Sequence, residues 1–218
     1  MKIIPAILEQ DIYEVQKKLD AVSSFAALAQ IDIADGKFVE STTIALAALK
    51  DIAIPMTVEI HLMVQNPQDY FQICADLRAR RVFWHYEAVG NDMKAVLERA
   101  GEFSFANGIA LNPETPLDVL SGVLERLDAV LIIGITPGAQ GRPFVPETLQ
   151  RVKTLRSAFG GPIAVDGAVS EKNIAALVSA GATDLAVGSA LFKSNNIVEA
   201  YQELQKLAGI TVDIGYLR

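Results

Sequence analysis

Residues 162–187 read PIAVDGAVSEKNIAALVSAGATDLAV and contain the smallest complete unit of the fold that we predict. An apolar run over 162–166 is followed by a helical pattern over 170–180 and then by a second apolar run over 184–187. Neither run alternates between apolar and polar residues, which is typical of parallel strands buried on both sides. The stretch therefore predicts a strand, a helix and a second strand that lies parallel to the first.

The helix of this unit has a boundary signal at each end. Ser170 is a candidate N-cap, because its hydroxyl can accept a hydrogen bond from an N–H of the first turn. Gly181 follows the last apolar position and suits the left-handed backbone that often ends a helix. Prolines near the first turn mark other predicted helices, at Asn66-Pro67, Thr115-Pro116 and Val145-Pro146.

The same alternation continues over the whole chain. We predict strands over residues 3–8, 28–33, 56–62, 81–86, 105–111, 129–135, 162–166 and 184–187. We predict helices over residues 11–24, 43–52, 67–77, 92–102, 116–124, 146–159, 170–180 and 197–207. Eight strands that alternate with eight helices predict a closed (β/α)8 barrel, the α/β fold of TIM-barrel type. No linker, charge block or low-complexity segment interrupts the pattern, so residues 1–218 are expected to form a single domain.

An open, doubly wound parallel sheet is the alternative architecture for this pattern. That fold normally places a glycine-rich turn directly after its first strand. Here the first predicted strand is followed by Leu8-Glu9-Gln10-Asp11, which contains no glycine. The sequence at this turn therefore favours the closed barrel.

Length, composition and charge narrow the class of protein further. The chain exceeds the roughly 200 residues that a (β/α)8 barrel needs, and 51% of its residues are hydrophobic. A net charge of −7 disfavours nucleic acid, although backbone N–H groups can still hold one phosphate. We see no signal peptide and no apolar run near the roughly 18 residues of a membrane span. With Cys74 as the single cysteine, and so no internal disulfide, we expect a cytoplasmic protein that does not bind membranes.

Polar residues at strand ends are the candidates for chemistry, because (β/α)8 barrels keep their catalytic groups there. Asp32, His61 and Asp166 end the second, third and seventh predicted strands and would converge if they point into the barrel mouth. Gln30 shares a strand face with Asp32 and lies one layer deeper, since side chains alternate along a strand. Two carboxylates and an imidazole can hold a divalent metal. Two opposed carboxylates can also move protons on two faces of a carbon.

Each of these residues also has a structural interpretation. A strand-end aspartate often caps the next helix, and a lone histidine is more often a satisfied buried residue than a ligand. Three such residues at equivalent depth on separate strands favour a functional site. We expect His85 to be structural, because Trp84 and Tyr86 indicate a packed strand in which its nitrogens are satisfied locally.

Glycine-rich loops follow the last three predicted strands, over residues 136–141 (TPGAQG), 166–168 (DGA) and 188–190 (GSA). Glycine lets backbone N–H groups approach an anion closely. Loops after the seventh and eighth strands form the usual phosphate site of this fold, whereas ordinary tight turns are the alternative interpretation. We assign phosphate or substrate binding to Gly138, Gly141, Gly167, Gly188 and Ser189.

The strand-end motifs, taken in order from Pro5 to Phe192, resemble the ribulose-phosphate 3-epimerase family. The matching motifs are Pro5-Ala6-Ile7-Leu8, Asp32-Ile33-Ala34-Asp35-Gly36-Lys37-Phe38-Val39, His61-Leu62-Met63-Val64, His85-Tyr86-Glu87-Ala88, Leu111-Asn112-Pro113-Glu114-Thr115-Pro116, Val165-Asp166-Gly167 and Gly188-Ser189-Ala190. Pro137-Gly138, Gly141 and Phe144 lie where the family has a mobile Pro-Gly-Phe-Gly-Gly-Gln loop. The order and number of these motifs make the resemblance highly specific.

The resemblance implies an activity and a role for each matching residue. The family consists of isomerases of the pentose phosphate pathway that interconvert D-ribulose 5-phosphate and D-xylulose 5-phosphate through a metal-stabilised ene-diolate. Asp32 and Asp166 would be the acid/base groups on opposite faces of the substrate carbon, and with His61 they would hold the metal. Met63 would line the pocket. The implied partner is a small phosphorylated sugar, and the family implies a homo-oligomer.

The chain departs from the family pattern at the site itself. Gln30 replaces the remaining metal-ligand histidine, and its neutral carbonyl oxygen would favour manganese, magnesium or no metal over zinc or iron. The other replacements are Ala6 for serine, Ala34 and Ile133 for methionines, Gln140 and Ala168 for glycines, and Ser41 for asparagine. They leave two alternatives open: an epimerase of another ketose phosphate, such as a hexulose phosphate, and a non-catalytic sugar-phosphate-binding paralogue.

Overall fold

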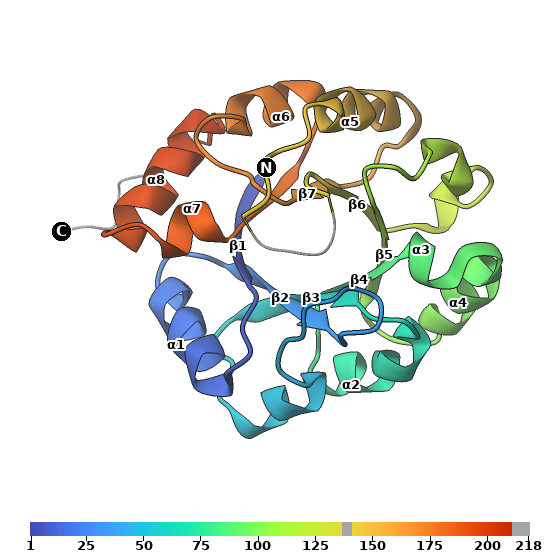
Figure 1. Ribbon diagram of the computed structural model, residues 1–218, viewed down its shortest axis with the longest axis horizontal. Helices are drawn as coiled ribbons and strands as arrows, with labels where there is room; N and C mark the ends of the chain where they lie inside the picture. Colours follow the sequence, from blue (N-terminus) through green and yellow to red (C-terminus); the bar gives the residue numbers. More distant parts are fainter. Residues whose placement is uncertain (137–140, 211–218) are drawn as a thin grey trace.

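The strands form a closed parallel barrel in a computed structural model that describes residues 1–136 and 141–210. Across these residues the strand order is β1-β2-β3-β4-β5-β6-β7-β8, and β1 pairs with both β2 and β8, which closes the ring (Figure 1). The strands are β1 (Lys2–Ile7), β2 (Leu28–Ala34), β3 (Thr57–Met63), β4 (Arg81–His85), β5 (Ala106–Leu111), β6 (Ala129–Ile133), β7 (Ile163–Asp166) and β8 (Asp184–Val187). The predicted (β/α)8 barrel is confirmed, with each strand within two residues of its expected bounds.

Helices surround the barrel as an outer ring, as the view down the barrel shows (Figure 1). The α-helices are α1 (Ile12–Ser23), α2 (Phe71–Asp76), α3 (Tyr86–Val89), α4 (Met93–Ala100), α5 (Glu147–Ala158), α6 (Ile174–Ala180), α7 (Ser189–Phe192) and α8 (Ile197–Leu207). The 3-10 helices are η1 (Leu46–Asp51), η2 (Pro67–Tyr70), η3 (Gly90–Asp92), η4 (Leu117–Leu120) and η5 (Leu124–Arg126). Within the described residues, no helix is both long and apolar enough to cross a bilayer.

Two of the predicted α-helices are 3-10 helices instead. In η1 the buried residues Leu46 and Leu49 are three positions apart, which matches the tighter 3-10 repeat. The segment predicted as a helix over 116–124 is split into η4 and η5, because Gly122 adopts a left-handed φ of 75° between them. Both connections still cover the barrel, but with short 3-10 helices of three to six residues.

The boundaries of α6 differ at one end from the prediction. Ser170 is not its N-cap: the helix begins at Ile174, and Asn173 accepts a hydrogen bond from the Ser170 N–H at 2.9 Å in the preceding turn. The asparagine side chain therefore closes the turn that the serine was expected to cap. At the other end Gly181 has a φ of 109°, which confirms the predicted left-handed terminus.

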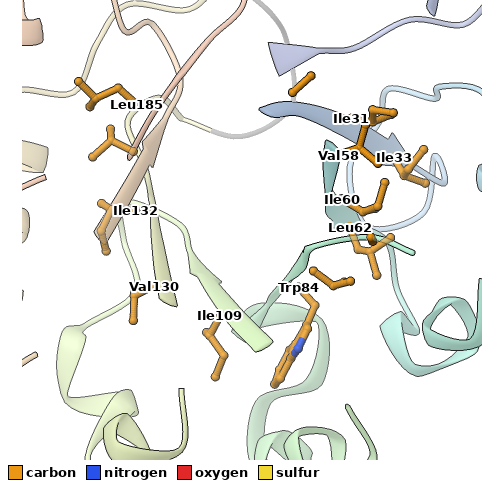
Figure 2. Close-up of a cluster of buried hydrophobic side chains, with 14 of the residues drawn as sticks. Ile31, Ile33, Val58, Ile60, Leu62, Trp84, Ile109, Val130, Ile132 and Leu185 are labelled. Carbon is orange, nitrogen blue, oxygen red and sulfur yellow. The ribbon is translucent and has the colours of Figure 1, made fainter. Parts of the chain in front are cut away.

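The main hydrophobic core lies between the outer face of the barrel and the helices. Figure 2 shows side chains of this layer on the strands, among them Ile31, Ile60, Trp84, Ile132 and Leu185. The alternate residues of each strand point into the ring instead. The strands are therefore buried on both faces, which explains their nearly continuous apolar sequence.

A single large ring fills the middle of the barrel interior. Phe83 packs there against small or aliphatic residues, which are Ala110, Ala129, Leu131, Ile133 and Ala164. Gly108 is required beside it, because an added Cβ would lie 2.3 Å from the Phe83 ring. The interior is thus a packed core and not a channel, and it separates the two ends of the barrel.

The amino-terminal end of the barrel is closed by a buried ion cluster. Arg81 donates to Glu59 at 2.6 Å and to Asp184 at 2.7 Å, and its guanidinium lies 4.6 Å from the centre of the Phe83 ring. All three charged side chains are buried. Burial raises the pKa of Glu59 to about 6, although Arg81 opposes this shift. Glu59 therefore belongs to the floor of the barrel and not to the site at its mouth.

Arg81→Met is expected to lower the free energy of unfolding by about 3–5 kcal/mol, because it leaves two buried carboxylates without their cation. Arg126→Met is the matched control. Arg126 pairs with Glu98 on the surface, and its loss should cost less than about 1 kcal/mol. Chemical denaturation of both variants measures the difference. Equal losses would show that the buried cluster is no more important than a surface pair.

Candidate active site

A cavity of about 220 Å³ opens at the carboxyl-terminal end of the barrel, which is room for a small metabolite. Its polar lining includes Asp32, His61, His85, Asn112 and Asp166, contributed by the ends of different strands. Apolar side chains make up much of the remaining wall. The cavity therefore lies at the strand ends where the candidate residues were expected.

Asp32, His61 and Asp166 meet at one point in this cavity. Asp32 and His61 are direct register partners on β2 and β3, whereas Asp166 ends β7 on another part of the ring. His61 Nδ1 lies 3.0 Å from Asp32 Oδ1 and 3.4 Å from Asp166 Oδ2. One ligand atom from each residue falls within 4.8 Å of the others. The predicted convergence of these three residues is confirmed by the geometry.

Gln30 lies beneath the two carboxylates and connects them. Its amide nitrogen donates to Asp32 Oδ1 at 2.8 Å and to Asp166 Oδ2 at 2.7 Å. Its carbonyl oxygen is buried and has no hydrogen-bond partner among the described residues. The amide therefore places its positive end between the carboxylates, where it offsets their repulsion.

Burial and mutual charge shift the pKa values of this cluster. Burial and the negative charge of Asp166 raise the pKa of Asp32, against hydrogen bonds from His61 and Gln30. Burial alone would lower the pKa of His61, but its hydrogen bonds to Asp166 and Asp32 and their charges outweigh burial and raise it to about 9. The cluster therefore retains a proton more strongly than isolated side chains would, as acid–base chemistry on a weakly acidic carbon requires.

The donor set fits a divalent metal ion, with one reservation at Gln30. Two carboxylate oxygens and one imidazole nitrogen within 4.8 Å of one another are a suitable set for such an ion. Gln30 turns its amide nitrogen toward this point, and nitrogen of an amide is not a ligand. Its unpartnered carbonyl oxygen could join the set only after the amide rotates by about half a turn.

His85 was expected to be structural, but its ring also lies at the site. Its two nitrogens are satisfied locally as predicted, by His61 Nε2 at 2.9 Å and by Glu87 Oε2 at 3.2 Å. However, the ring also lines the cavity and stands directly behind His61. Its place as the first residue of a strand-end motif, His85-Tyr86-Glu87, was the available signal for this role.

The expected anion-binding loops line the cavity opposite His85. Gly141, Gly167, Gly188 and Ser189 all border it, as does Met63. Gly167 has a φ of 106° and approaches Ile135 so closely that an added Cβ would lie 2.9 Å from that side chain. Gly138, assigned to the same role from the sequence, lies outside the described residues.

The cavity lining includes one charged residue that had not been singled out from the sequence and several that had. Lys193 follows Ser189 by one helical turn and adds a cation to the cavity, which is the charge that a phosphate ligand needs. Among the family departures, Ala6, Ser41, Ile133 and Ala168 line the cavity. Ala34 is buried and is not among the lining residues, so it cannot change the cavity wall directly.

Fold and site together define the class first: this is a (β/α)8-barrel enzyme with a titratable cluster at the carboxyl ends of its strands. Comparison with known proteins then gives the family. The model of the Ribulose-phosphate 3 epimerase family matches residues 2–192, and the chain belongs to this family.

Individual relatives agree with the family match. The ribulose-phosphate 3-epimerase of Schizosaccharomyces pombe is 32% identical over 211 residues, which cover 94% of this chain and 92% of the relative. The enzyme of the same name from Synechocystis is 32% identical over 208 residues, covering 91% and 90%. A solved 3-hexulose-6-phosphate synthase has a TM-score of 0.70 at 17% identity, covering 95% of this chain and 99% of that one. At that identity the last likeness shows the fold alone.

Ala168 gives a stability test of the loop that follows β7. Its φ of 52° lies in the left-handed region, which strains a residue that has a Cβ. Ala168→Gly should raise the free energy of unfolding by about 1 kcal/mol. Ala176→Gly, the same change at an exposed position inside α6, should lower it by about 1 kcal/mol. If denaturation showed a loss for both variants, the loop would not be strained at Ala168.

Proposed function

We propose that this protein catalyses epimerisation at carbon 3 of a ketopentose phosphate and interconverts D-ribulose 5-phosphate and D-xylulose 5-phosphate. The observation that carries the proposal is the pair Asp32 and Asp166, which reach one point from β2 and β7 with His61 between them. Membership of the ribulose-phosphate 3-epimerase family supports the same reaction. Self-association and a cytoplasmic location, expected from the sequence, stay predictions.

The two carboxylates are suited to the two proton transfers of an epimerisation. Epimerisation needs a base that removes a proton from one face of the carbon and an acid that returns one to the other face. The raised pKa of Asp32 favours a proton on that residue, so that it can serve as the acid while Asp166 serves as the base. In the reverse reaction the two residues exchange roles.

Neighbouring groups would stabilise the negative charge that develops on the substrate ketone. His61 and the Gln30 amide are the donors closest to the carboxylates, and they hold both in place. Asp32, His61 and Asp166 would hold a divalent ion, which supplies a positive charge for the ketone oxygen when it is bound. With Gln30 in place of a second histidine, this set holds one imidazole and two carboxylates, which would favour a hard ion such as Mg²⁺ or Mn²⁺ over zinc or iron.

The opposite wall of the cavity would hold the substrate phosphate. Gly167, Gly188 and Ser189 offer backbone N–H groups there, and Lys193 offers a charge. Binding the phosphate at that wall and the ketone near His61 would orient carbon 3 between the carboxylates. The cavity geometry thus supports a short phosphorylated ketose as the ligand.

Asp166→Asn should lower kcat for epimerisation by a factor of about 10²–10⁴, because the amide can neither take nor give the proton. A coupled assay for xylulose 5-phosphate measures the loss. Asp118→Asn, a matched change at an exposed carboxylate of η4, should leave kcat unchanged. Turnover of Asp166→Asn at the wild-type rate would remove Asp166 from the mechanism.

Deuterium exchange in D2O separates a two-base reaction from a one-base reaction. With one carboxylate on each face, Asp166→Asn should exchange the carbon-3 proton of only one of the two epimers, through Asp32. Asp32→Asn should exchange the other epimer. If either single variant exchanged both epimers equally, one group would be serving both faces.

Gln30→His tests the metal assignment without an activity assay. An imidazole in place of the amide adds a ligand beside Asp32, His61 and Asp166. The affinity for Zn²⁺ should therefore rise about tenfold or more, because changes at the residues around a bound metal alter its affinity about 10–100-fold. Calorimetric titration of Zn²⁺ into both proteins measures it. Equal affinities would show that position 30 does not face the ion.

A hexulose phosphate is the second candidate substrate. Ala6 and Ile133 line the cavity where the family pattern has serine and methionine, so position 6 is smaller and has no hydroxyl, and position 133 is branched and has no sulfur. A higher kcat/KM on a hexulose 6-phosphate than on ribulose 5-phosphate would select this candidate. Binding of both sugars without turnover of either would indicate instead a sugar-phosphate-binding paralogue.

A further inference from the structure

The loop that follows β5 is held by two charged side chains at the point where it reaches the cavity. The Asn112 N–H donates to Glu87 Oε1 at 2.8 Å, and the Asn112 carbonyl oxygen accepts from Arg151 Nη2 at 3.2 Å. Glu87 also accepts from the Thr115 hydroxyl, and Arg151 donates to the Thr115 carbonyl oxygen at 2.7 Å. Glu87 in α3 and Arg151 in α5 therefore fix both ends of the loop over residues 112–115.

The side-chain amide of Asn112 takes no part in this anchoring. Asn112 borders the cavity, and its Oδ1 is buried without a hydrogen-bond partner within residues 1–136 and 141–210. A buried polar atom without a partner is destabilising, so it calls for an explanation such as a role in binding. A hydroxyl group suits the amide as a ligand, because it can donate to the oxygen or accept from the nitrogen.

The order of the strands places Asn112 across the cavity from the wall assigned to the phosphate. His85 at the end of β4 pairs with Ala110 on β5, and in the closed ring β4 and β5 lie across from β8 and β1 (Figure 1). Gly188 and Ser189 of the phosphate wall follow β8. A ketose 5-phosphate with its phosphate there, and with carbon 3 between the two carboxylates, presents its other end to β4 and β5. That end is carbon 1, which carries a hydroxyl group.

We propose that Asn112 is a specificity-determining residue that binds the carbon-1 hydroxyl of the ketose phosphate, and that Glu87 and Arg151 position it. The two anchors hold its main chain while the amide stays without a protein partner, so the amide is placed in advance for the ligand. The identity of the ligand rests on the proposed epimerase function, whereas the anchoring of Asn112 does not.

Two sugars that differ only at carbon 1 test the contact: D-xylulose 5-phosphate and its 1-deoxy analogue. Exchange of the carbon-3 proton in D2O, followed by NMR, gives kcat/KM for both. The wild-type protein should prefer the hydroxylated sugar about tenfold or more, because a site that hydrogen-bonds a hydroxyl discriminates against an analogue without it. Asn112→Ala should lower this preference about tenfold. The hydroxyl changes the acidity of carbon 3 equally in both proteins, so the change in preference reports the contact.

Asn91→Ala is the matched control, because Asn91 is exposed in η3, away from the cavity lining. It should keep both the activity and the preference of the wild-type protein. Circular dichroism and thermal unfolding first establish that each variant is folded. A folded Asn112→Ala protein with the wild-type preference would overturn the proposal, and so would a wild-type protein with equal kcat/KM on both sugars.

Arg151→Met tests the positioning role, with Arg156→Met as control. Arg156 lies on the same helix and also donates to two carbonyl oxygens, those of Gly181 at 3.0 Å and Phe159 at 2.8 Å, but outside the cavity lining. Only Arg151→Met should lower the preference for the carbon-1 hydroxyl and speed hydrogen exchange of the Asn112 N–H, by about 3–10-fold for a lost hydrogen bond. Arg151→Lys, which keeps a donor and the charge, should restore part of both. Equal effects of the two Met variants would exclude a positioning role for Arg151.

Binding measurements distinguish failure of the contact from failure of the proposed reaction. If the wild-type protein epimerises neither sugar, the proposed function fails, and calorimetric titration of both sugars into the wild-type and Asn112→Ala proteins decides the contact. A loss of affinity in the variant for D-xylulose 5-phosphate alone would support it, whereas equal affinities, or no binding of either sugar, would overturn it. Normal turnover with an unchanged preference in Asn112→Ala would overturn the contact and leave the epimerase function standing.

Discussion

Closure of the parallel barrel is the constraint on which the rest of the molecule depends. Once β1 pairs with β8, every second side chain of each strand points into a confined interior. That interior has three levels: the ion cluster around Arg81 at the amino-terminal end, Phe83 with small residues in the middle, and the titratable cluster at the mouth. The side chains of the lower two levels are buried, so the polar groups at the mouth rest on a packed floor.

This arrangement explains how two like charges are kept together at the mouth. Burial, together with the negative charge of Asp166, raises the pKa of Asp32. The Gln30 amide donates to both residues from below, and His61 Nδ1 lies 3.0 Å from Asp32 and 3.4 Å from Asp166. Gln30 therefore does more than replace a metal-ligand histidine. Its amide also bridges the two carboxylates that the proposed reaction uses.

Much of the fold could be predicted because strand patterns are local. Buried β-branched runs located all the strands, and strand alternation placed Asp32 above Gln30 on one face. The helical layer was harder. A 3-10 turn such as η1 has the same apolar residues as an α-helix, and Ser170 looked like a cap until Asn173 was found to close the turn. The type of a short helix and the residue at which it begins depend on competition between nearby groups of similar hydrogen-bonding strength.

By itself the sequence determined the class of fold, the family and the residues that end each strand, because these follow from periodicity and from motifs in a fixed order. Only the tertiary structure decided how those residues act on one another. The direction of the Gln30 amide and the contact between His61 and His85 join separate strands at distances near 3 Å. Such distances depend on how the strands are placed around the closed ring, which no local pattern of residues records.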